Sequence, residues 1–273
     1  MKVYLNGEIK DSQSIVDMFE PGFLFGWGVF ETLRVYNKVA VFLNEHLKRL
    51  EKGAKNIDLD FPAVDFSSQI NSLLEENKLA EAYCRITLFK KRKSTGVIIY
   101  VSNFEYYNLD DYEKGFKAII APFKRYSDDF LTGVKSTSYL HSRFAWKKAQ
   151  DREVDEAVFL NENNFLSEGT RTNLFFIKNN KIFTPSIDCG ILSGITREKV
   201  IEVIKKEGLE LIEGEFSLDK LKSADEAFLT SSLMEIMPLV EIDQEQIGSK
   251  RMGRITEVLL NGYRKLIKEQ SNG

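Results

Sequence analysis

The chain has 273 residues, of which 43% are hydrophobic and 29% charged, and this composition is typical of folded proteins rather than of disordered or repetitive ones. Its 38 lysines and arginines against 41 aspartates and glutamates give a formal net charge of −3, with both signs interspersed, so no basic stripe indicates a nucleic-acid partner. The N-terminus lacks the apolar core of a signal peptide and no apolar run approaches the roughly 20 residues that span a bilayer, so we expect a cytoplasmic protein that acts on a small molecule and not on a membrane.

Histidine and cysteine are scarce, and this restricts the chemistry. Cys84 and Cys189 both stand in apolar sequence, and we interpret them as core residues rather than as a disulfide or a zinc site. His46 and His141 each lie in a predicted helix, without the neighbours that a catalytic triad or a metal site requires. We therefore expect no metal, and any chemistry must rest on lysine, glutamate, arginine, tyrosine and hydroxyl side chains.

The first half of the chain is predicted to be rich in strands. Residues 2–10 read as a hairpin, because Asn6 and Gly7 form a strong two-residue turn signal. The other predicted elements of this half are two strands within 28–43 joined near Asn37, helices over 45–57 and 67–77, and strands over 82–89, 96–104 and 116–123.

A charged, poorly periodic stretch over residues 124–132 is predicted to connect two domains, 1–123 and 133–273. Strands dominate both halves and the helices cluster between them, which favours an α+β chain of two domains over a doubly wound sheet. The elements predicted after the connection are a helix beginning after Ser136, strands over 155–161, 172–179, 181–184 and 226–230, and helices over 196–206, 218–222 and 251–268.

Lys135 lies between the apolar Val134 and a run of small hydroxyl residues in LTGVKSTSYL. A solvated loop lysine is the simplest interpretation, because most lysines are exposed. A lysine that forms a Schiff base instead needs a free amine, which burial and nearby positive charge favour. Val134 and Tyr139 are placed to supply the burial. Lys135 is therefore a candidate for holding pyridoxal 5′-phosphate, which also needs an acidic partner for its ring nitrogen, an anion site and a donor to its phenolate oxygen.

Other segments supply such groups. Glu168, in a predicted turn between strands, is a candidate partner for the pyridine nitrogen, because a facing carboxylate keeps that nitrogen protonated; an exposed turn glutamate is the alternative. Arg49 is a candidate for a bidentate phosphate contact, against the alternative of a helix-surface arginine. Gly194, Ile195 and Thr196 lie at a predicted helix start, where backbone N–H groups and the helix dipole favour an anion.

A hydroxyl-rich segment, Thr230, Ser231 and Ser232, follows the predicted strand 226–230 and offers a second anion site, although such turns are common.

Taken in order, these segments resemble the class IV (fold type IV) pyridoxal-phosphate enzymes, which include branched-chain aminotransferases, D-amino acid aminotransferases and 4-amino-4-deoxychorismate lyases. The segments span nearly the whole chain: FGWGVFETLRVY, NEHLKRLEKGAK, AYCRITLF, GVKSTSYL, DEAVFLNENNFLSEGTRTNLFFIKNNKIFTP, GILSGITREKV and ADEAFLTSSLMEIMPLVEID.

The resemblance implies a small N-terminal and a larger C-terminal domain with the active site in the cleft between them, and a homodimer. It implies that Lys135 forms the Schiff base and shuttles protons, and that Glu168 partners the pyridine nitrogen. Tyr139 is similar to the family tyrosine that donates to the phenolate oxygen, although its spacing from the lysine is one residue shorter than in branched-chain aminotransferases. The phosphate contacts that the resemblance implies are Arg49, Gly194, Ile195, Thr196, Ser231 and Ser232.

Substrate contacts are expected at Phe30, Thr32, Tyr83, Arg85 and Leu233. Thr32 stands where branched-chain aminotransferases usually have glycine and where the lyases carry a threonine thought to transfer a proton. The leucine-methionine pair that begins at Leu233 and the short chain also favour the lyase. Tyr83 and Arg85 instead resemble the tyrosine-any-arginine strand of branched-chain aminotransferases, or pack between strands. The arginine-any-histidine carboxylate trap of D-amino acid aminotransferases is not evident.

We therefore favour a lyase that releases pyruvate from 4-amino-4-deoxychorismate and forms 4-aminobenzoate for folate biosynthesis, with Lys135 and Thr32 as its catalytic residues. The alternative is an aminotransferase that acts between a branched-chain or D-amino acid and a 2-oxo acid. A second alternative is a non-catalytic binding protein on the same fold.

Overall fold

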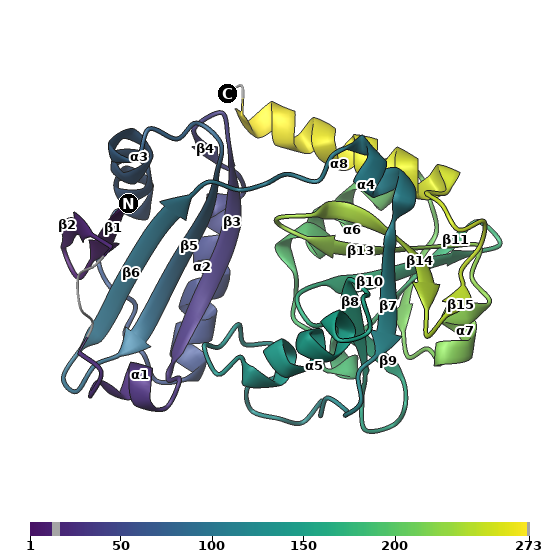
Figure 1. The fold of residues 1–273 in the computed structure, drawn as a ribbon, viewed down its shortest axis with the longest axis horizontal. Helices are drawn as coiled ribbons and strands as arrows, with labels where there is room; N and C mark the ends of the chain where they lie inside the picture. The colour runs from purple at the N-terminus through teal and green to yellow at the C-terminus, as the bar shows by residue number, and fades with distance from the viewer. Residues whose placement is uncertain (13–16, 272–273) are drawn as a thin grey trace. The chain divides into compact units, whose positions relative to one another are not determined.

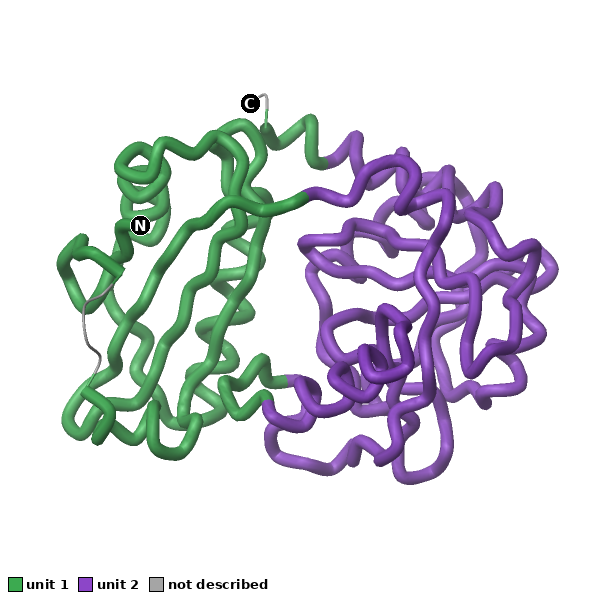
Figure 2. Tube along the Cα trace, viewed as in Figure 1, with its two compact units in different colours: residues 1–105, 134–139, 267–273 green, residues 106–133, 140–266 purple. Residues whose placement is uncertain are grey.

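The computed structural model describes residues 1–12 and 17–271 (Figure 1). The chain divides into two compact units, drawn in green and purple in Figure 2. The first unit comprises Met1–Glu105, Val134–Tyr139 and Ile267–Gly273, and the second comprises Tyr106–Gly133 and Leu140–Leu266. Each unit has its own sheet and its own helices, which agrees with the expected α+β class.

The division differs from the single connection expected over 124–132. β7 (Phe116–Ile120) belongs to the second unit because it pairs in parallel with both β14 (Glu235–Ile242) and β8 (Glu156–Leu160). Residues 134–139 belong to the first unit because their backbone bonds to β3 (Gly28–Tyr36). The chain therefore returns to the first unit after it has begun the second.

The first unit is built on an antiparallel six-stranded sheet in the order β2-β1-β6-β5-β3-β4. Along β3 and β5 successive side chains alternate between a buried face, which includes Leu33 and Ile86, and a half-buried face, which includes Thr32 and Arg85. The strands other than β3 are β1 (Lys2–Leu5), β2 (Glu8–Asp11), β4 (Val39–Ala40), β5 (Ala82–Lys90) and β6 (Thr95–Ser102).

Three helices belong to the first unit, α1 (Pro21–Leu24), α2 (Leu43–Asn56) and α3 (Phe66–Glu76). α2 packs against β3, and α3 packs against β1 and β6 (Figure 1). The buried residues of α2 and α3 recur at helical spacing, as Leu50 and Ala54 do in α2, so each helix turns one apolar stripe toward the sheet. The hairpin, both long helices and the three long strands of this unit were predicted from the sequence.

The second unit is built on a mixed nine-stranded sheet in the order β12-β11-β10-β13-β14-β7-β8-β9, with β15 paired to β14. The pairs β11/β12, β14/β7 and β7/β8 are parallel and the others antiparallel. Its strands not yet given are β9 (Leu166–Gly169), β10 (Asn173–Lys178), β11 (Lys181–Pro185), β12 (Leu211–Gly214), β13 (Glu226–Ser231) and β15 (Glu245–Gln246).

Five α-helices and one 3₁₀ turn accompany this sheet, and α6 packs against β13 and β12. They are α4 (Leu109–Lys114), α5 (Leu140–Gln150), α6 (Ile195–Lys206), α7 (Leu218–Lys222), α8 (Arg254–Ser271) and the 3₁₀ turn Ile187–Cys189. The last residues of α8 cluster with the first unit. Among the described residues, no helix is both long and apolar enough to cross a membrane.

Strands β9, β12, β14 and β15 were not predicted. β14 reads as a continuous buried run interrupted by Pro238, without the polar alternation that identifies a half-exposed strand. Glu168 was expected in a turn, and it lies instead within β9, one residue before the strand ends.

Gly28 is expected to tolerate no side chain. An added Cβ would lie 2.5 Å from the carbonyl oxygen of Leu88 and 2.9 Å from Oγ1 of Thr137, and β5 cannot withdraw without losing its pairing to β3. We expect Gly28→Ala to lower the free energy of unfolding by about 1–3 kcal/mol in urea titrations.

Gly53→Ala is the matched control, because its Cβ would make only ordinary contacts, the nearest at 3.4 Å from Cγ1 of Val29. Alanine in a helix interior should leave stability unchanged or raise it by about 0.5–1 kcal/mol. Equal stability of the two variants would contradict this view of the packing.

Candidate active site

Lys135 is held against the first residues of β3 by backbone hydrogen bonds. The Phe30 N–H donates to the carbonyl oxygen of Lys135 at 2.9 Å, and the Thr137 N–H donates to the carbonyl oxygen of Gly28 at 2.8 Å. The Thr137 hydroxyl also donates to the carbonyl oxygen of Gly26 at 2.6 Å. A loop lysine usually moves freely, but this backbone is fixed on both sides of Lys135. Val134 is buried, as expected, and Lys135 itself is half-buried.

The ring of Phe30 is the common neighbour of the groups around Lys135. Nζ of Lys135 lies 4.8 Å from the ring centroid, and the guanidinium carbon of Arg85 lies 3.7 Å from it. Tyr139 packs edge-on against the same ring, with centroids 5.5 Å apart. Two basic side chains therefore contact the ring of Phe30. The structure thus brings together Phe30, Arg85, Lys135 and Tyr139.

Thr32 and Tyr83 lie on the same half-buried face of this sheet. Thr32 is directly opposite Arg85 in the pairing of β3 with β5, and Arg85 is opposite Tyr100 of β6. Tyr83 stacks on Tyr100 with centroids 5.6 Å apart, and burial together with the hydrogen bond to Tyr83 raises the pKa of Tyr100. Arg85 has no carboxylate partner among the described residues; its Nε donates to Oγ1 of Thr87 at 3.3 Å.

Arg49 is held by a buried carboxylate. Nε and Nη2 of Arg49 donate to the two oxygens of Glu31, each at 2.7 Å, and Nδ1 of His46 lies 2.7 Å from Oε2 of Glu31. Glu31 and His46 are almost fully buried. Burial favours the neutral form of Glu31, but the charge and hydrogen bonds of Arg49, helped by His46, outweigh it and lower the pKa of Glu31 to about 2. Arg49 is therefore oriented by an ion pair.

His46 is neutral at physiological pH. Burial is the main cause that lowers its pKa, and the positive charges of Arg49 and Lys135 act in the same direction, against the opposing effect of Glu31. Since the Glu31 carboxylate can only accept, the neutral ring donates through Nδ1. The sequence placed His46 in a predicted helix and did not predict this hydrogen bond.

In the second unit, Glu168 is buried, forms an ion pair with one arginine and accepts two hydrogen bonds. Nη1 of Arg125 lies 2.9 Å from Oε1, the Leu192 N–H donates to Oε2 at 2.8 Å, and Nδ2 of Asn173 donates to Oε2 at 3.2 Å. A carboxylate offers about four acceptor positions, so the two hydrogen bonds to Glu168 leave room for the N–H of a pyridinium ring. The Glu168 carboxylate, with the partners that the structure describes, is thus suited to accept the N–H of the pyridoxal phosphate ring nitrogen.

A second buried carboxylate supports the turn that follows Glu168. Glu156 accepts from the backbone N–H of Thr170 at 3.1 Å, from the Thr170 hydroxyl, and from the Thr172 hydroxyl at 3.2 Å. Burial raises the pKa of Glu156, although Arg171 and Thr170 act against this. The turn between β9 and β10 is therefore held by hydrogen bonds from Thr170 and Thr172 to Glu156 of β8.

The N-terminus of α6 fits a phosphate. The helix begins at Ile195, close to where the sequence predicted it, with Gly194 as N-cap and no side chain capping the first N–H groups. A Cβ on Gly194 would lie 2.0 Å from Oδ1 of Asn173, so the backbone can stand this close to Asn173 only without a side chain. Unpaired N–H groups at the start of a helix bind anions.

The predicted hydroxyl site lies in the hairpin between β13 and β14. Ser231 is paired with Glu235, so Ser232, Leu233 and Met234 form a three-residue loop. The Ser231 hydroxyl accepts the Met234 N–H at 3.2 Å, and Nε of Arg264 donates to Oε2 of the buried Glu235 at 2.7 Å. Ser231 therefore serves the loop itself, while Ser232 and Leu233 are half-buried at its tip.

The predicted residues thus form two groups, one in each unit. Phe30, Thr32, Tyr83, Arg85, Lys135 and Tyr139 gather on one face of the first sheet, with Arg49 on the ion pair to Glu31; Glu168, Gly194, Ile195, Thr196, Ser231, Ser232 and Leu233 lie in the second unit. Sequence reasoning missed Glu31, Arg125 and Asn173. A signal existed for Glu31, because it occupies the apolar side of the alternation in β3, where a charge must be paired. No such sequence signal existed for Arg125.

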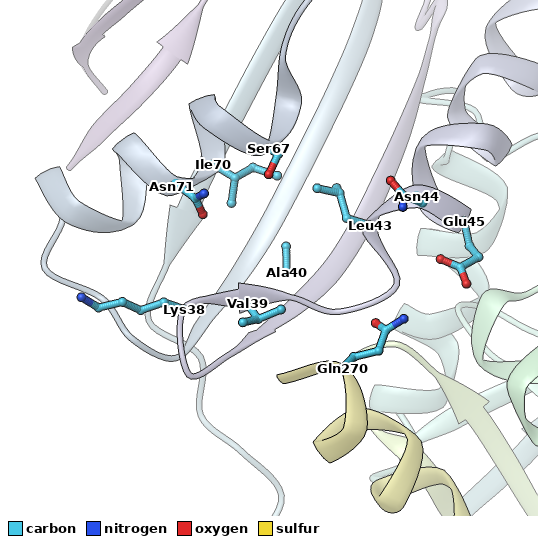
Figure 3. A pocket seen from close by; sticks show the side chains of 10 residues that line it. All are labelled: Lys38, Val39, Ala40, Leu43, Asn44, Glu45, Ser67, Ile70, Asn71 and Gln270. Carbon is cyan, nitrogen blue, oxygen red and sulfur yellow. The ribbon is translucent and has the colours of Figure 1, made fainter. Parts of the chain in front are cut away.

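A separate cavity of about 370 Å³ lies in the first unit (Figure 3). It is lined by β4, the starts of α2 and α3, and Gln270 of α8, whose Oε1 accepts the Phe42 N–H at 2.9 Å. None of the predicted site residues lines it.

The chain is similar to a known protein family and to individual members of it. A family model described as amino-transferase class IV matches residues 28–242. A putative branched-chain-amino-acid aminotransferase from Methanocaldococcus jannaschii is 36% identical, over 97% of this chain and 96% of that protein. The aminodeoxychorismate lyase of Bacillus subtilis is 30% identical, over 97% of this chain and 94% of its own length.

Among solved structures, a branched-chain aminotransferase from Thermoproteus uzoniensis superposes with a TM-score of 0.91 at 29% identity. The match covers 99% of this chain and 95% of that one. The fold is therefore the one expected from the sequence.

The buried pair of Glu31 and His46 predicts an acid-sensitive core. The pKa of Glu31 is about 2 in the folded chain against an ordinary 4.5, so its stabilising contribution is complete above about pH 4.5 and is lost as pH falls toward 2. By linkage this amounts to about 3 kcal/mol. The lowered pKa of His46 acts in the same direction below about pH 6.5, because the unfolded imidazole takes up a proton first.

We expect Glu31→Gln to remove most of the pH dependence of unfolding between pH 4.5 and 2, measured by urea titration. Glu75→Gln, at an exposed carboxyl of α3, should keep the wild-type pH profile. Equal profiles for Glu31→Gln and wild type would contradict the ion pair.

Proposed function

This chain belongs to the class IV aminotransferase family, a family of pyridoxal-phosphate enzymes, and we propose that its reaction is the release of pyruvate from 4-amino-4-deoxychorismate to leave 4-aminobenzoate. The observation that carries the proposal is Thr32, whose side chain shares the half-buried sheet face with Arg85 and Phe30. Because the members of this family are enzymes, we set aside the alternative of a non-catalytic binding protein on the same fold. The place in folate biosynthesis and the cytoplasmic location stay predictions.

The proposal assigns cofactor contacts to residues of both units. In the first unit, Lys135 is the amine that holds the cofactor aldehyde, Tyr139 donates to its phenolate oxygen, and Arg49 binds phosphate. In the second unit, Glu168 faces the ring nitrogen. The phosphate contacts assigned there are Gly194, Ile195, Thr196 and Ser232, while a contact from Ser231 stays a prediction of the family resemblance. When bound, pyridoxal phosphate withdraws electrons from the substrate bond that breaks.

Lys135 moves the first proton. With substrate bound, the Lys135 amine would act as the base that takes the proton from the ring carbon bearing the substrate nitrogen. The fixed backbone on both sides of Lys135 restricts where Nζ can reach, which supports transfer at a single carbon. Loss of this proton and cleavage of the bond between the neighbouring ring carbon and the enol-pyruvyl oxygen, with the electron pair leaving on that oxygen, make the ring aromatic.

Thr32 relays a proton to the departing three-carbon group, so that enol-pyruvate leaves as pyruvate. Arg85 supports a substrate that carries carboxylates, because its guanidinium stands opposite Thr32 without a carboxylate partner among the described residues. Phe30, Tyr83 and Leu233 complete the proposed substrate contacts. Positive charge on this face attracts an anionic substrate and places its leaving group near the hydroxyl.

We expect the purified, pyridoxal-phosphate-loaded protein to form 4-aminobenzoate and pyruvate in equal amounts from 4-amino-4-deoxychorismate. Thr32→Val should lower kcat by about 10²-fold, the usual worth of one positioned proton donor. Ser102→Ala is the control, because Ser102 lies opposite Tyr83 on the same face and has no assigned role. Pyruvate release that is equally fast in Thr32→Val and in wild type would sink the assignment of Thr32.

An aminotransferase is the second candidate, favoured by the stacked Tyr83 and Tyr100 beside Arg85 and by the 36% identity to a putative branched-chain aminotransferase. Here Lys135 would move the proton from the substrate Cα to the cofactor carbon that carries the nitrogen. Adding L-leucine, L-glutamate or D-alanine alone should then bleach the visible absorption band of the loaded protein. A band that survives every amino acid, together with pyruvate release, supports the lyase.

We also propose that the chain is a homodimer. Apolar side chains between residues 18 and 27 are unusually exposed, including Phe23 at 63%, Leu24 at 53% and Phe25 at 71%. Contiguous apolar surface on a monomer marks an interaction site, and the family resemblance indicates a second copy as its partner.

Light scattering should therefore give twice the mass of one chain, and Phe25→Asp should shift the protein toward a monomer. Leu109→Asp is the control, because Leu109 is 72% exposed on α4, away from that segment in the sequence. A wild-type protein that stays monomeric at all concentrations would refute the homodimer.

A further inference from the structure

A buried hydroxyl in the second unit lacks a hydrogen-bond partner. Oγ1 of Thr230 and Oγ of Ser167 are both buried, and neither has a partner within the described part of the chain. Thr230 is 2% exposed and Ser167 fully buried. Buried polar groups are nearly always hydrogen-bonded, so each exception requires a physical explanation. The surroundings of the two hydroxyls differ.

Thr230 lies beside the residues assigned to the cofactor. In the antiparallel pairing of β10 with β13 it is directly opposite Asn173, and directly opposite residues place their side chains on the same face of a sheet. Nδ2 of Asn173 donates to Glu168 at 3.2 Å and to the carbonyl oxygen of Leu192 at 2.9 Å. Thr230 therefore shares a face with the amide that contacts Glu168.

The same face leads to the start of α6. Gly194, the N-cap of α6, stands so close to Asn173 that an added Cβ would be 2.0 Å from its Oδ1, and α6 packs against β13. The hydroxyl of Thr230 and the uncapped N–H groups of α6 are thus donors on one side of the sheet. Neither kind of donor has a protein acceptor among the residues that the structure describes, and together they fit an anion with several oxygens.

The neighbouring hydroxyls do not share this arrangement. Ser231 follows Thr230 in β13, so its side chain points to the other face, and its Oγ already accepts the Met234 N–H at 3.2 Å. Ser167 precedes Glu168 in β9 and likewise points away from the face of that carboxylate. Thr230 alone of these three combines a buried, partnerless hydroxyl with the face of Asn173.

We propose that Thr230 is a further cofactor-contacting residue, whose hydroxyl donates a hydrogen bond to a phosphate oxygen of pyridoxal phosphate. The inference deepens the proposed function, because it rests on the cofactor contacts assigned there to Glu168 and to the start of α6. It is independent of whether the reaction is lysis or transamination. The bound phosphate supplies the acceptor that the buried hydroxyl otherwise lacks.

Thr230→Val tests the proposal, because valine keeps the shape of threonine and removes only the hydroxyl. Without cofactor, the variant should unfold at the same or a higher urea concentration than wild type, since a partnerless buried hydroxyl destabilises the fold. The Kd for pyridoxal phosphate, measured by absorption titration, should rise about tenfold, as expected for a lost hydrogen bond to a charged group. One substitution should thus leave the free protein intact and weaken the complex.

Two further variants control the result. Thr230→Ser keeps the hydroxyl and should bind pyridoxal phosphate within about threefold of wild type, well inside the effect of a lost charged hydrogen bond. Ser167→Ala removes the other buried hydroxyl and should leave the Kd unchanged. Titration with pyridoxal, which lacks the phosphate, should show the same affinity for wild type and Thr230→Val.

An unchanged Kd for pyridoxal phosphate in Thr230→Val overturns the proposal, and so does an equal loss of affinity for pyridoxal, which would assign the contact to the ring. A wild-type protein that binds no pyridoxal phosphate overturns the proposed function together with this inference. The first two results leave the proposed function standing, so the two failures are distinguishable.

Discussion

The hydrogen bonds between residues 134–137 and the first residues of β3 are the constraint on which the first-unit group depends. They hold a segment distant in sequence along the edge of β3 at Gly28 and Phe30. Phe30 is thereby fixed beneath Nζ of Lys135, and β3 carries Thr32 and Glu31 on its two faces. A shift of this pairing by one residue would exchange the faces of the strand. Backbone pairing, rather than any side chain, therefore sets the position of Lys135.

Buried carboxylates organise the charged groups in both units. Glu31 orients Arg49 and His46, Glu156 secures the turn after β9, and Glu168 is held by the ion pair with Arg125 and by two hydrogen bonds. A buried charge that loses its partner is strongly destabilising, so each carboxylate holds its donors in one arrangement. The proposed site is thus oriented before any ligand binds, which reduces the ordering that binding must impose.

The sequence was sufficient for the features that repeat or that punctuate the chain. Strands β3 and β5, helices α2 and α3, and the start of α6 after Gly194 were all predicted, because each depends on local geometry. The boundary between the units was not, because the return of residues 134–139 to β3 is a long-range pairing with no local signal. β14 was missed for a related reason, since a strand buried on both faces lacks alternation.

The candidate site shows the same limit. Lys135, Glu168 and Arg49 were singled out by residue type and by family resemblance, but their partners were found only in three dimensions. Arg125 lies in a stretch that reads as a connecting loop, yet its guanidinium is 2.9 Å from Glu168. Thr230 was noticed for its hydroxyl, and the pairing of β13 with β10 was needed to place it beside Asn173. Loop and strand partners of this kind are set by tertiary structure.

The most direct test of the account is to locate the lysine that holds the cofactor. The protein would be loaded with pyridoxal phosphate, reduced with borohydride to make the linkage permanent, digested, and mapped by mass spectrometry. The account predicts that the label lies on Lys135. A label on another lysine, or no label on a correctly folded protein, would contradict it.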